Sequence, residues 1–226
     1  MIDIKDKSKC CGCSACANIC PNNAITMQID NEGFKYPVVD LKKCINCGLC
    51  EKVCPYNNEY IKKVVYEKSV AYGGWNNDDE VRRKSTSGGI FSAISKFILN
   101  NNGVVCGAIY NEKFEVVHEI VDNIEDLDKI YGSKYVQSDI KDNFRRIKEY
   151  LKDGRLVLFS GTPCQVSGLN SFLGKEYGNL YTCDIVCHGV PSPKVFEKYK
   201  RELEETNNSE ILNINFRDKV SRMARI

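Results

Sequence analysis

Two copies of one cysteine pattern dominate the first quarter of this 226-residue chain. The spacing C-x2-C-x2-C-x3-C, followed by proline, occurs twice, and the second copy repeats the first at an offset of 34 residues. This run is typical of cubane iron–sulfur sites in which the fourth cysteine reaches across to the neighbouring cluster. The two copies are Cys10, Cys13, Cys16 and Cys20 before Pro21, and Cys44, Cys47, Cys50 and Cys54 before Pro55.

The repeat therefore predicts two [4Fe-4S] clusters with crossed ligands. One cluster is expected to take Cys10, Cys13, Cys16 and Cys54, and the other Cys44, Cys47, Cys50 and Cys20. Structural zinc is the alternative, but zinc sites usually pair two Cys-x2-Cys knuckles across a longer loop, without this duplication and these prolines. Cys11 is left over and is assigned no role.

Composition limits the compartment and the class of partner. The chain holds 13 cysteines, an odd number, and nine of them lie in the first 54 residues. Because the N-terminus has no apolar leader, disulfides explain them poorly, and a reducing cytoplasm is expected. The formal net charge of +2 argues against a nucleic-acid binder, and no apolar run is long enough to span a bilayer.

The uneven cysteine distribution predicts a domain boundary near residues 57–65. Residues 1–57 are expected to form an α+β, ferredoxin-like two-cluster module, with two short strands around the turn at Asp30–Gly33. The remainder predicts an α/β domain with a mixed or mainly parallel sheet, because strand-like and helix-like segments alternate. Strands are expected at 64–75, 103–110, 114–121, 156–161, 180–189 and 211–216, with 156–161 and 180–189 in the interior of the sheet. Helices are expected at 78–85, 89–101, 123–130, 139–152 and 163–173, and after Pro193.

Three stretches of the α/β domain carry residues suited to binding. Residues 84–90 place small hydroxyl residues and two glycines before an apolar helix, where free N–H groups suit a phosphate or simply form an N-cap. Residues 160–165 follow a strand, at the edge where ligands of open α/β sheets gather. Cys164, Cys183 and Cys187 offer three thiolates for a further cluster, and buried core cysteines are the alternative.

The two histidines of the chain differ in their surroundings. His118 lies inside an alternating, strand-like segment and is predicted to be structural. His188 follows Cys187 and precedes Gly189, a position suited to donating a hydrogen bond to a cofactor.

The order of four segments resembles the coenzyme F420 hydrogenase/dehydrogenase beta-subunit family. These segments are STSGG at 85–89, GSKYVQS at 132–138, FSGTPCQ at 159–165 and DIVCHGVPS at 184–192. An N-terminal two-cluster ferredoxin fused to this domain is typical of many bacterial relatives, and the resemblance covers essentially the entire chain. It implies a flavin-binding N-terminal region at 64–152 and a C-terminal region at 153–226. The latter is expected to be incomplete, because family members usually continue well past residue 226.

The resemblance implies a flavoprotein that binds FAD beside an iron–sulfur cluster. The implied flavin contacts are Ser87, Gly88, Gly89, Lys134 and Thr162. The implied ligands of a third [4Fe-4S] cluster near the flavin are Cys164, Cys183 and Cys187.

The predicted function is a cytoplasmic iron–sulfur flavoprotein oxidoreductase that passes electrons between [4Fe-4S] clusters and FAD. Its donor or acceptor is expected to be a redox partner protein or a small molecule. The alternative is a non-catalytic two-cluster electron carrier or adaptor whose α/β domain docks a partner enzyme. The visible spectrum distinguishes the two, because bound FAD adds its own resolved bands to the broad absorption of the clusters.

Overall fold

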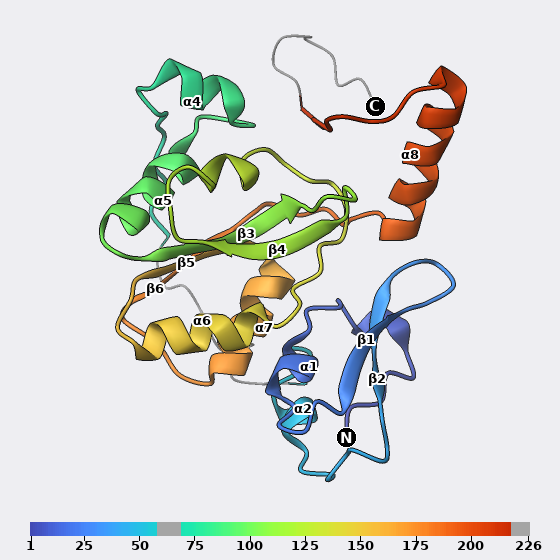
Figure 1. The fold of residues 1–226 in the computed structure, drawn as a ribbon. Helices are drawn as coiled ribbons and strands as arrows, with labels where there is room; N and C mark the ends of the chain where they lie inside the picture. The colour runs from blue at the N-terminus through green and yellow to red at the C-terminus, as the bar shows by residue number, and fades with distance from the viewer. Residues whose placement is uncertain (58–68, 218–226) are drawn as a thin grey trace.

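A cysteine-rich module packs against an α/β domain in the computed structural model, which describes residues 1–57 and 69–217 (Figure 1). The elements of the module are the 3-10 turn η1 (Lys7–Lys9), helix α1 (Ala15–Ile19), strands β1 (Ile25–Ile29) and β2 (Lys35–Val39), and helix α2 (Leu49–Lys52). The two strands pair antiparallel on either side of the expected turn. Asp30 Oδ1 closes that turn by accepting hydrogen bonds from the N–H groups of Glu32 and Phe34, at 3.0 and 3.1 Å.

A four-stranded sheet in the order β4-β3-β5-β6 forms the centre of the α/β domain. Its strands are β3 (Val104–Tyr110), β4 (Val116–Val121), β5 (Val157–Gly161) and β6 (Leu180–Asp184). Strands β3, β5 and β6 run parallel, whereas β4 returns antiparallel to β3. The predicted fold class, a ferredoxin-like module followed by an α/β domain with a mixed sheet, is confirmed.

Helices cover both faces of this sheet (Figure 1). Helix α5 (Ile90–Asn100) packs on one face, while α6 (Asn143–Lys152) and α7 (Pro163–Leu173) pack on the other. The alternation of side chains along each strand produces this division: Val105 and Leu158 join the core beneath α5, and Cys106 and Phe159 join the core beneath α6 and α7. The second core is also where α1 of the module meets α6 and α7.

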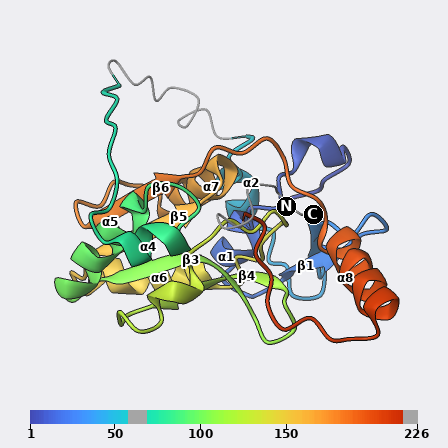
Figure 2. The same cartoon turned by 90° about the horizontal axis from the view of Figure 1, so that it is seen from above.

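Three further elements lie at the ends of the domain. Helix α4 (Asp79–Lys84) precedes α5, and the 3-10 turn η2 (Leu127–Lys129) follows β4. Helix α8 (Pro193–Asn207) lies at the opposite end of the molecule from α5 (Figure 2). None of the helices in the described ranges has the length and apolar character needed to cross a membrane.

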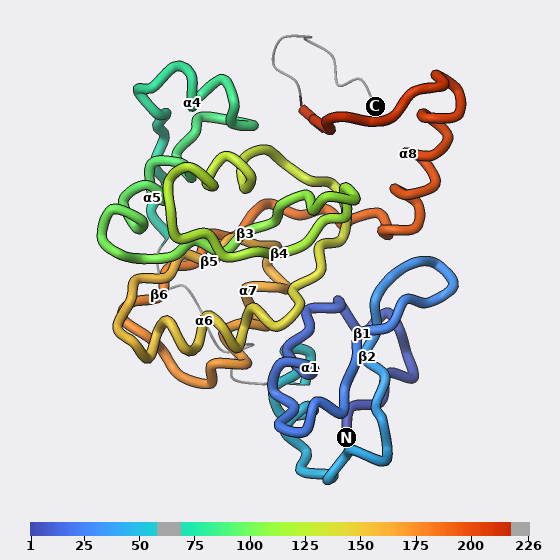
Figure 3. Tube along the Cα trace, viewed as in Figure 1, coloured from blue at the N-terminus to red at the C-terminus, as the bar shows by residue number. Residues whose placement is uncertain are grey.

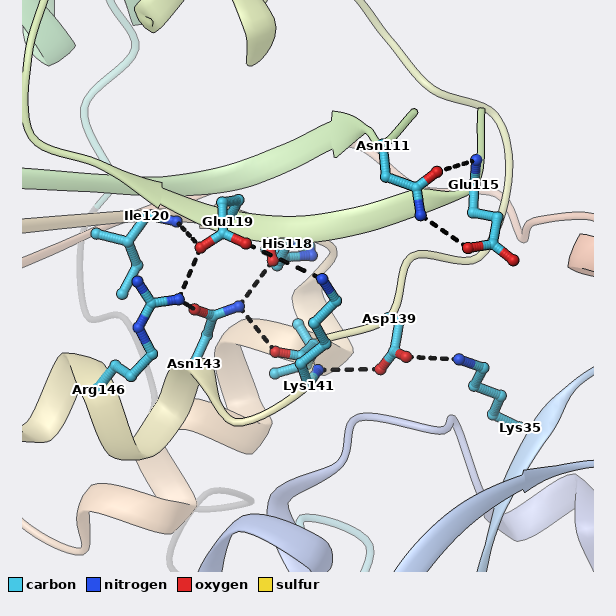
Figure 4. A network of polar contacts seen from close by, with 11 residues as sticks. Lys35, Asn111, Glu115, His118, Glu119, Ile120, Asp139, Lys141, Asn143 and Arg146 are labelled. Atoms are coloured by element: carbon cyan, nitrogen blue, oxygen red, sulfur yellow. Dashed lines mark hydrogen bonds and ion pairs between the residues drawn. The ribbon is translucent and has the colours of Figure 1, made fainter. Parts of the chain in front are cut away.

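Polar contacts join the module to the α/β domain. The loop between β1 and β2 reaches the start of α8 (Figure 3), where Ser192 Oγ donates to Glu32 O at 2.6 Å. Lys35 Nζ of β2 pairs with Asp139 Oδ2, in the loop that precedes α6, at 2.5 Å (Figure 4). The same view shows the ion pair of Arg146 with Glu119 inside the α/β domain, at 2.6 Å.

Two expected strands are absent from the described part of the chain. Residues 69–75 form no strand, and Asn76 N–H instead donates to Gly88 O at 2.7 Å, which ties this segment to the start of α5. Residues 211–216 form no strand either, because Ile214 and Phe216 pack on Phe196 of α8. Residues 64–68, and most of the expected boundary at 57–65, lie outside the described residues.

The prediction of an interior strand at 180–189 is also wrong. Strand β6 ends at Asp184 and forms an edge of the sheet, with Tyr181 47% exposed and Val186 89% exposed. An apolar run indicates an interior strand only when both edges find partners, and within residues 1–57 and 69–217 only β5 pairs with β6. The expected helices at 123–130 and 139–152 are shorter than predicted, at Leu127–Lys129 and Asn143–Lys152.

Candidate functional site

Both cysteine runs follow the same unusual backbone path. Gly12 and Ser14 of the first run have φ of +66° and +62°, and the corresponding residues of the second run, Asn46 and Gly48, have +53° and +74°. Left-handed conformations are sterically easy for glycine and tolerated by asparagine, and they turn successive side chains toward a common centre. The repeat in sequence is therefore also a repeat in backbone conformation.

One cavity of the module is lined by four cysteines, three from the second run and one from the first. They are Cys44, Cys47, Cys50 and Cys20, and we call this hollow the outer cavity. Backbone donors support its sulfurs: Ile2 N–H donates to Cys50 Sγ at 3.1 Å, and Ala24 N–H to Cys20 Sγ at 3.2 Å. Such contacts favour a negatively charged sulfur and tune the potential of a cluster.

A second cavity reverses the roles of the two runs. It is lined by Cys10, Cys11, Cys13, Cys16 and Cys54, and we call it the inner cavity. Burial raises the pKa of the Cys16 thiol to about 12, and also raises the pKa of Cys10. Thiolates form in such surroundings only when positively charged iron compensates for the lost hydration.

The donor sets of both cavities fit [4Fe-4S] clusters. Cys20 of the first run lies in the outer cavity and Cys54 of the second run in the inner one, as the crossed arrangement requires. In residues 1–57 and 69–217, no three His, Cys, Asp or Glu side chains converge closely enough to hold a single metal ion. The cysteines thus surround hollows rather than one point, while the assignment of individual ligands stays a prediction.

Cys11, which the sequence left without a role, lies between the inner cavity and the α/β domain. Its thiol interacts with the side chains of Cys13 and of Cys164, which lies at the start of α7. The contact with Cys13 raises the pKa of Cys11 to about 12, and the contact with Cys11 raises the pKa of Cys164. In the sequence, Cys11 stood out only as a cysteine outside the repeat. Its contact with Cys164 depends on the packing of α1 on α7, which the sequence does not show.

The three cysteines predicted as ligands of a third cluster do not come together in the described structure. Cys164 Sγ lies 3.0 Å from Thr162 Oγ1 in the first turn of α7. Cys183 pairs with Ser160 in the sheet and packs with the core beneath α5, whereas α7 packs on the opposite face. Cys187 is exposed on the loop after β6. The third cluster therefore stays a prediction.

Most of the residues implied as flavin contacts gather near the start of α5. Ser87, Gly88 and Gly89 lead directly into this helix, with Gly89 as its N-cap. Thr86 Oγ1 accepts hydrogen bonds from the N–H and Oγ of Ser133, at 3.0 and 3.2 Å, so the loop that carries Lys134 lies alongside. Amides of a first helical turn have no intrahelical acceptor and suit a phosphate.

Lys134 and Thr162 are engaged in local structure instead. Lys134 Nζ donates to the carbonyl groups of Lys129, Ile130 and Tyr131, at 3.1, 3.0 and 2.8 Å, and so closes the end of η2. Burial lowers the pKa of Lys134 to about 8. Thr162 is the N-cap residue of α7. The described contacts therefore fit a cofactor phosphate at α5 better than they fit a direct contact from Lys134.

We expect the buried side chain of His118 to make the fold less stable in mild acid. It is buried, and its Nε2 lies 3.0 Å from Ser160 O. Burial lowers the pKa of His118 to about 4 from its ordinary 6.5, so between these values the unfolded chain binds a proton that the folded chain does not. We expect the free energy of unfolding to fall by about 1 kcal/mol from pH 7 to pH 5.5 on this account.

Chemical denaturation of the wild type and His118→Gln at both pH values measures this contribution. The variant should lose that share of the pH dependence, even if it is less stable at pH 7. An identical difference between the two pH values in both proteins would show that His118 is not the responsible group.

Comparison with known proteins assigns three consecutive stretches of the chain. Residues 9–58 match the family described as a 4Fe-4S dicluster domain. Residues 71–142 match the N-terminal part, and residues 154–225 the C-terminal part, of the coenzyme F420 hydrogenase/dehydrogenase beta subunit. The dicluster match supports iron–sulfur clusters in the two cysteine runs, and the other two matches together cover well over half of the chain.

Two individual proteins are similar to this chain. A coenzyme F420-dependent sulfite reductase of Methanocaldococcus jannaschii is 29% identical over 196 residues, which is 84% of this chain and 29% of that protein. The chain thus spans less than a third of this relative. A chain of the F420-reducing [NiFe] hydrogenase complex of Methanosarcina barkeri is similar at 20% identity, over 60% of this chain and 49% of that one, with a TM-score of 0.45.

Proposed function

We propose that this chain, which belongs to the coenzyme F420 hydrogenase/dehydrogenase beta-subunit family, is an electron-transferring iron–sulfur oxidoreductase that holds two [4Fe-4S] clusters and FAD. Iron–sulfur chemistry and membership of an oxidoreductase family are its established part. The flavin, the ligands and the electron donor or acceptor are proposed here.

The contact between the inner cavity and α7 carries the proposal. Cys13 is buried in the core that it shares with α6 and α7, and a Cβ atom placed on Gly168 would lie 3.0 Å from its Sγ. A side chain at position 168 would crowd this proposed cluster ligand, so glycine suits the close approach of the helix. Because electrons transfer best between centres held at short range, this packing supports a path from the module into the α/β domain.

The α/β domain would hold the flavin at the start of α5. The loop at Ser87–Gly89 and the first turn of α5 would bind a phosphate of FAD, and the hydrogen bonds between Thr86 and Ser133 would keep the two loops together. When bound, a flavin accepts two electrons and releases them singly, which suits an exchange with one-electron clusters. The residues of the chain would hold the two kinds of centre in fixed positions.

Analysis of the purified holoprotein tests the proposal. After anaerobic reconstitution we expect about eight iron and eight sulfide per chain, with one FAD released by acid, and about twelve iron if a third cluster forms. About eight iron without flavin would favour the alternative, an electron carrier whose α/β domain docks a partner enzyme. Colourless protein with stoichiometric zinc would refute the proposal.

Ser87→Asp tests the proposed flavin site. A carboxylate at the start of α5 is favourable for the helix but would repel a phosphate bound there, so FAD affinity should fall about tenfold or more while the fold persists. Flavin fluorescence titration of the apoflavoprotein measures the affinity. Ser209→Asp, which places the same charge at an exposed position just after α8, is the matched control and should bind FAD as the wild type does. Equal affinity in both variants would place the flavin elsewhere.

A further inference from the structure

The two cavities of the module face different surroundings. The inner cavity includes Cys13, which is buried in the core shared with the α/β domain, and Cys11, which reaches Cys164. In the outer cavity, Cys50 is buried in the separate core of the module, and Cys47 is exposed. The packing thus gives the two proposed clusters an order, with one next to the α/β domain and the other next to solvent.

Exposed apolar side chains surround the outer cavity. Ile45 and Leu49 line it and remain 62% and 39% exposed. Leu41, in the turn that leads into Cys44, is 68% exposed. Three large apolar side chains within one short exposed segment are costly to leave in water, and such patches commonly mark contact surfaces. We call Leu41, Ile45 and Leu49 the outer patch.

The charges beside the outer patch leave an excess of positive charge. The segment 40–52, which carries the outer patch, contains two acidic residues, and both form ion pairs. Asp40 pairs with Lys43 Nζ at 3.9 Å, and Glu51 pairs with the N-terminal amine of Met1 at 3.0 Å. Lys42 and Lys52 are exposed, and neither forms an ion pair with any residue in the described ranges 1–57 and 69–217. An apolar centre with lysines at its rim is complementary to an acidic protein surface.

We propose that the outer patch, with Lys42 and Lys52, docks an acidic one-electron carrier protein over the cluster of the outer cavity. This inference rests on the proposed iron–sulfur function and names the partner class and its place. In each docking event, the reduced carrier loses one electron, and the oxidised cluster of the outer cavity gains it. No bond is made and no proton moves. Relay from the outer to the inner cluster then brings the electron to the α/β domain, and the reverse path serves electrons leaving it.

Stopped-flow reduction of the reconstituted holoprotein by an acidic plant-type [2Fe-2S] ferredoxin, reduced beforehand, tests the docking. Steering by opposite charges raises association rates and weakens with salt. The Lys42→Glu/Lys52→Glu double variant should therefore react about tenfold more slowly at low ionic strength and lose most of its salt dependence. Lys198→Glu, which reverses one charge on the exposed side of α8 and far from the outer patch in sequence, is the control and should react as the wild type does.

Iron, sulfide and dithionite-reducible absorbance, measured on the same samples, distinguish a protein without clusters from a protein whose clusters the ferredoxin does not reach. Wild-type protein without clusters would overturn the proposed function. Full clusters that dithionite reduces, together with an unchanged ferredoxin rate in the double variant or an equal loss in Lys198→Glu, would overturn the docking proposal alone. Full clusters that this ferredoxin does not reduce in the wild type would overturn it as well.

Discussion

Replacement of Cys20 by alanine is expected to remove the cluster of the second cysteine run while leaving that of the first. The physical reason is the crossing: Cys20 lies in the outer cavity with Cys44, Cys47 and Cys50, although it belongs to the other run in sequence. A cubane that loses one of its four thiolates is exposed to water and is readily lost. Iron should therefore fall from about eight to about four per chain.

Electron paramagnetic resonance of the reduced variants identifies which cluster remains. Cys20→Ala should give the same spectrum as Cys47→Ala, whereas Cys54→Ala should match Cys13→Ala. A spectrum of Cys20→Ala that matches Cys13→Ala would mean that each run binds its own cluster, against the crossed arrangement. Cys11→Ala is the control: it removes a cysteine that also lines the inner cavity, and it should keep about eight iron.

The cluster module could be predicted from the sequence because residues close together in the chain determine the conformation of each cysteine run. Four cysteines at fixed spacing, with Gly12 and Gly48 where the backbone turns left-handed, determine the conformation of each run within a few residues. The duplication then relates one run to the other, and the two cavities contain the cysteines that the crossing requires. The mixed α/β sheet was also predictable, since strand and helix periodicities alternate along the chain.

Features set by packing could not be predicted in this way. An apolar run such as 180–189 contains no information about its neighbours in the sheet, so the edge position of β6 was missed. The same holds for Cys11 and Cys164, which are far apart in sequence and meet only because α1 packs on α7. The sequence identified the cysteines that line the two cavities, but not how the module attaches to the domain.

Arg145 is the clearest residue that sequence analysis missed. In the sequence it falls on the polar side of an amphipathic helix, α6, where arginine is common and indicates no particular contact. In the structure, its guanidinium donates to the carbonyl groups of Asn18, Cys20 and Ala17, at 2.5, 2.6 and 3.2 Å, and to Asn23 Oδ1 at 2.6 Å. These acceptors lie at the end of α1, where the helix dipole is negative and a cation is favoured. One side chain of the domain thus holds the segment that carries Cys20.

Arg145→Met should therefore loosen the module from the α/β domain at a cost of about 3 kcal/mol, because it leaves several acceptors without their charged donor. Hydrogen exchange of the holoprotein should show faster exchange in residues 14–24, and denaturation should give the loss in stability. Arg146→Met is the matched control, since its partner Glu119 lies within the same domain, 2.6 Å away, in a half-exposed pair worth about 1 kcal/mol or less. Equal protection of residues 14–24 in the two variants would mean that the module is held by its apolar contacts with α6 and α7 rather than by Arg145.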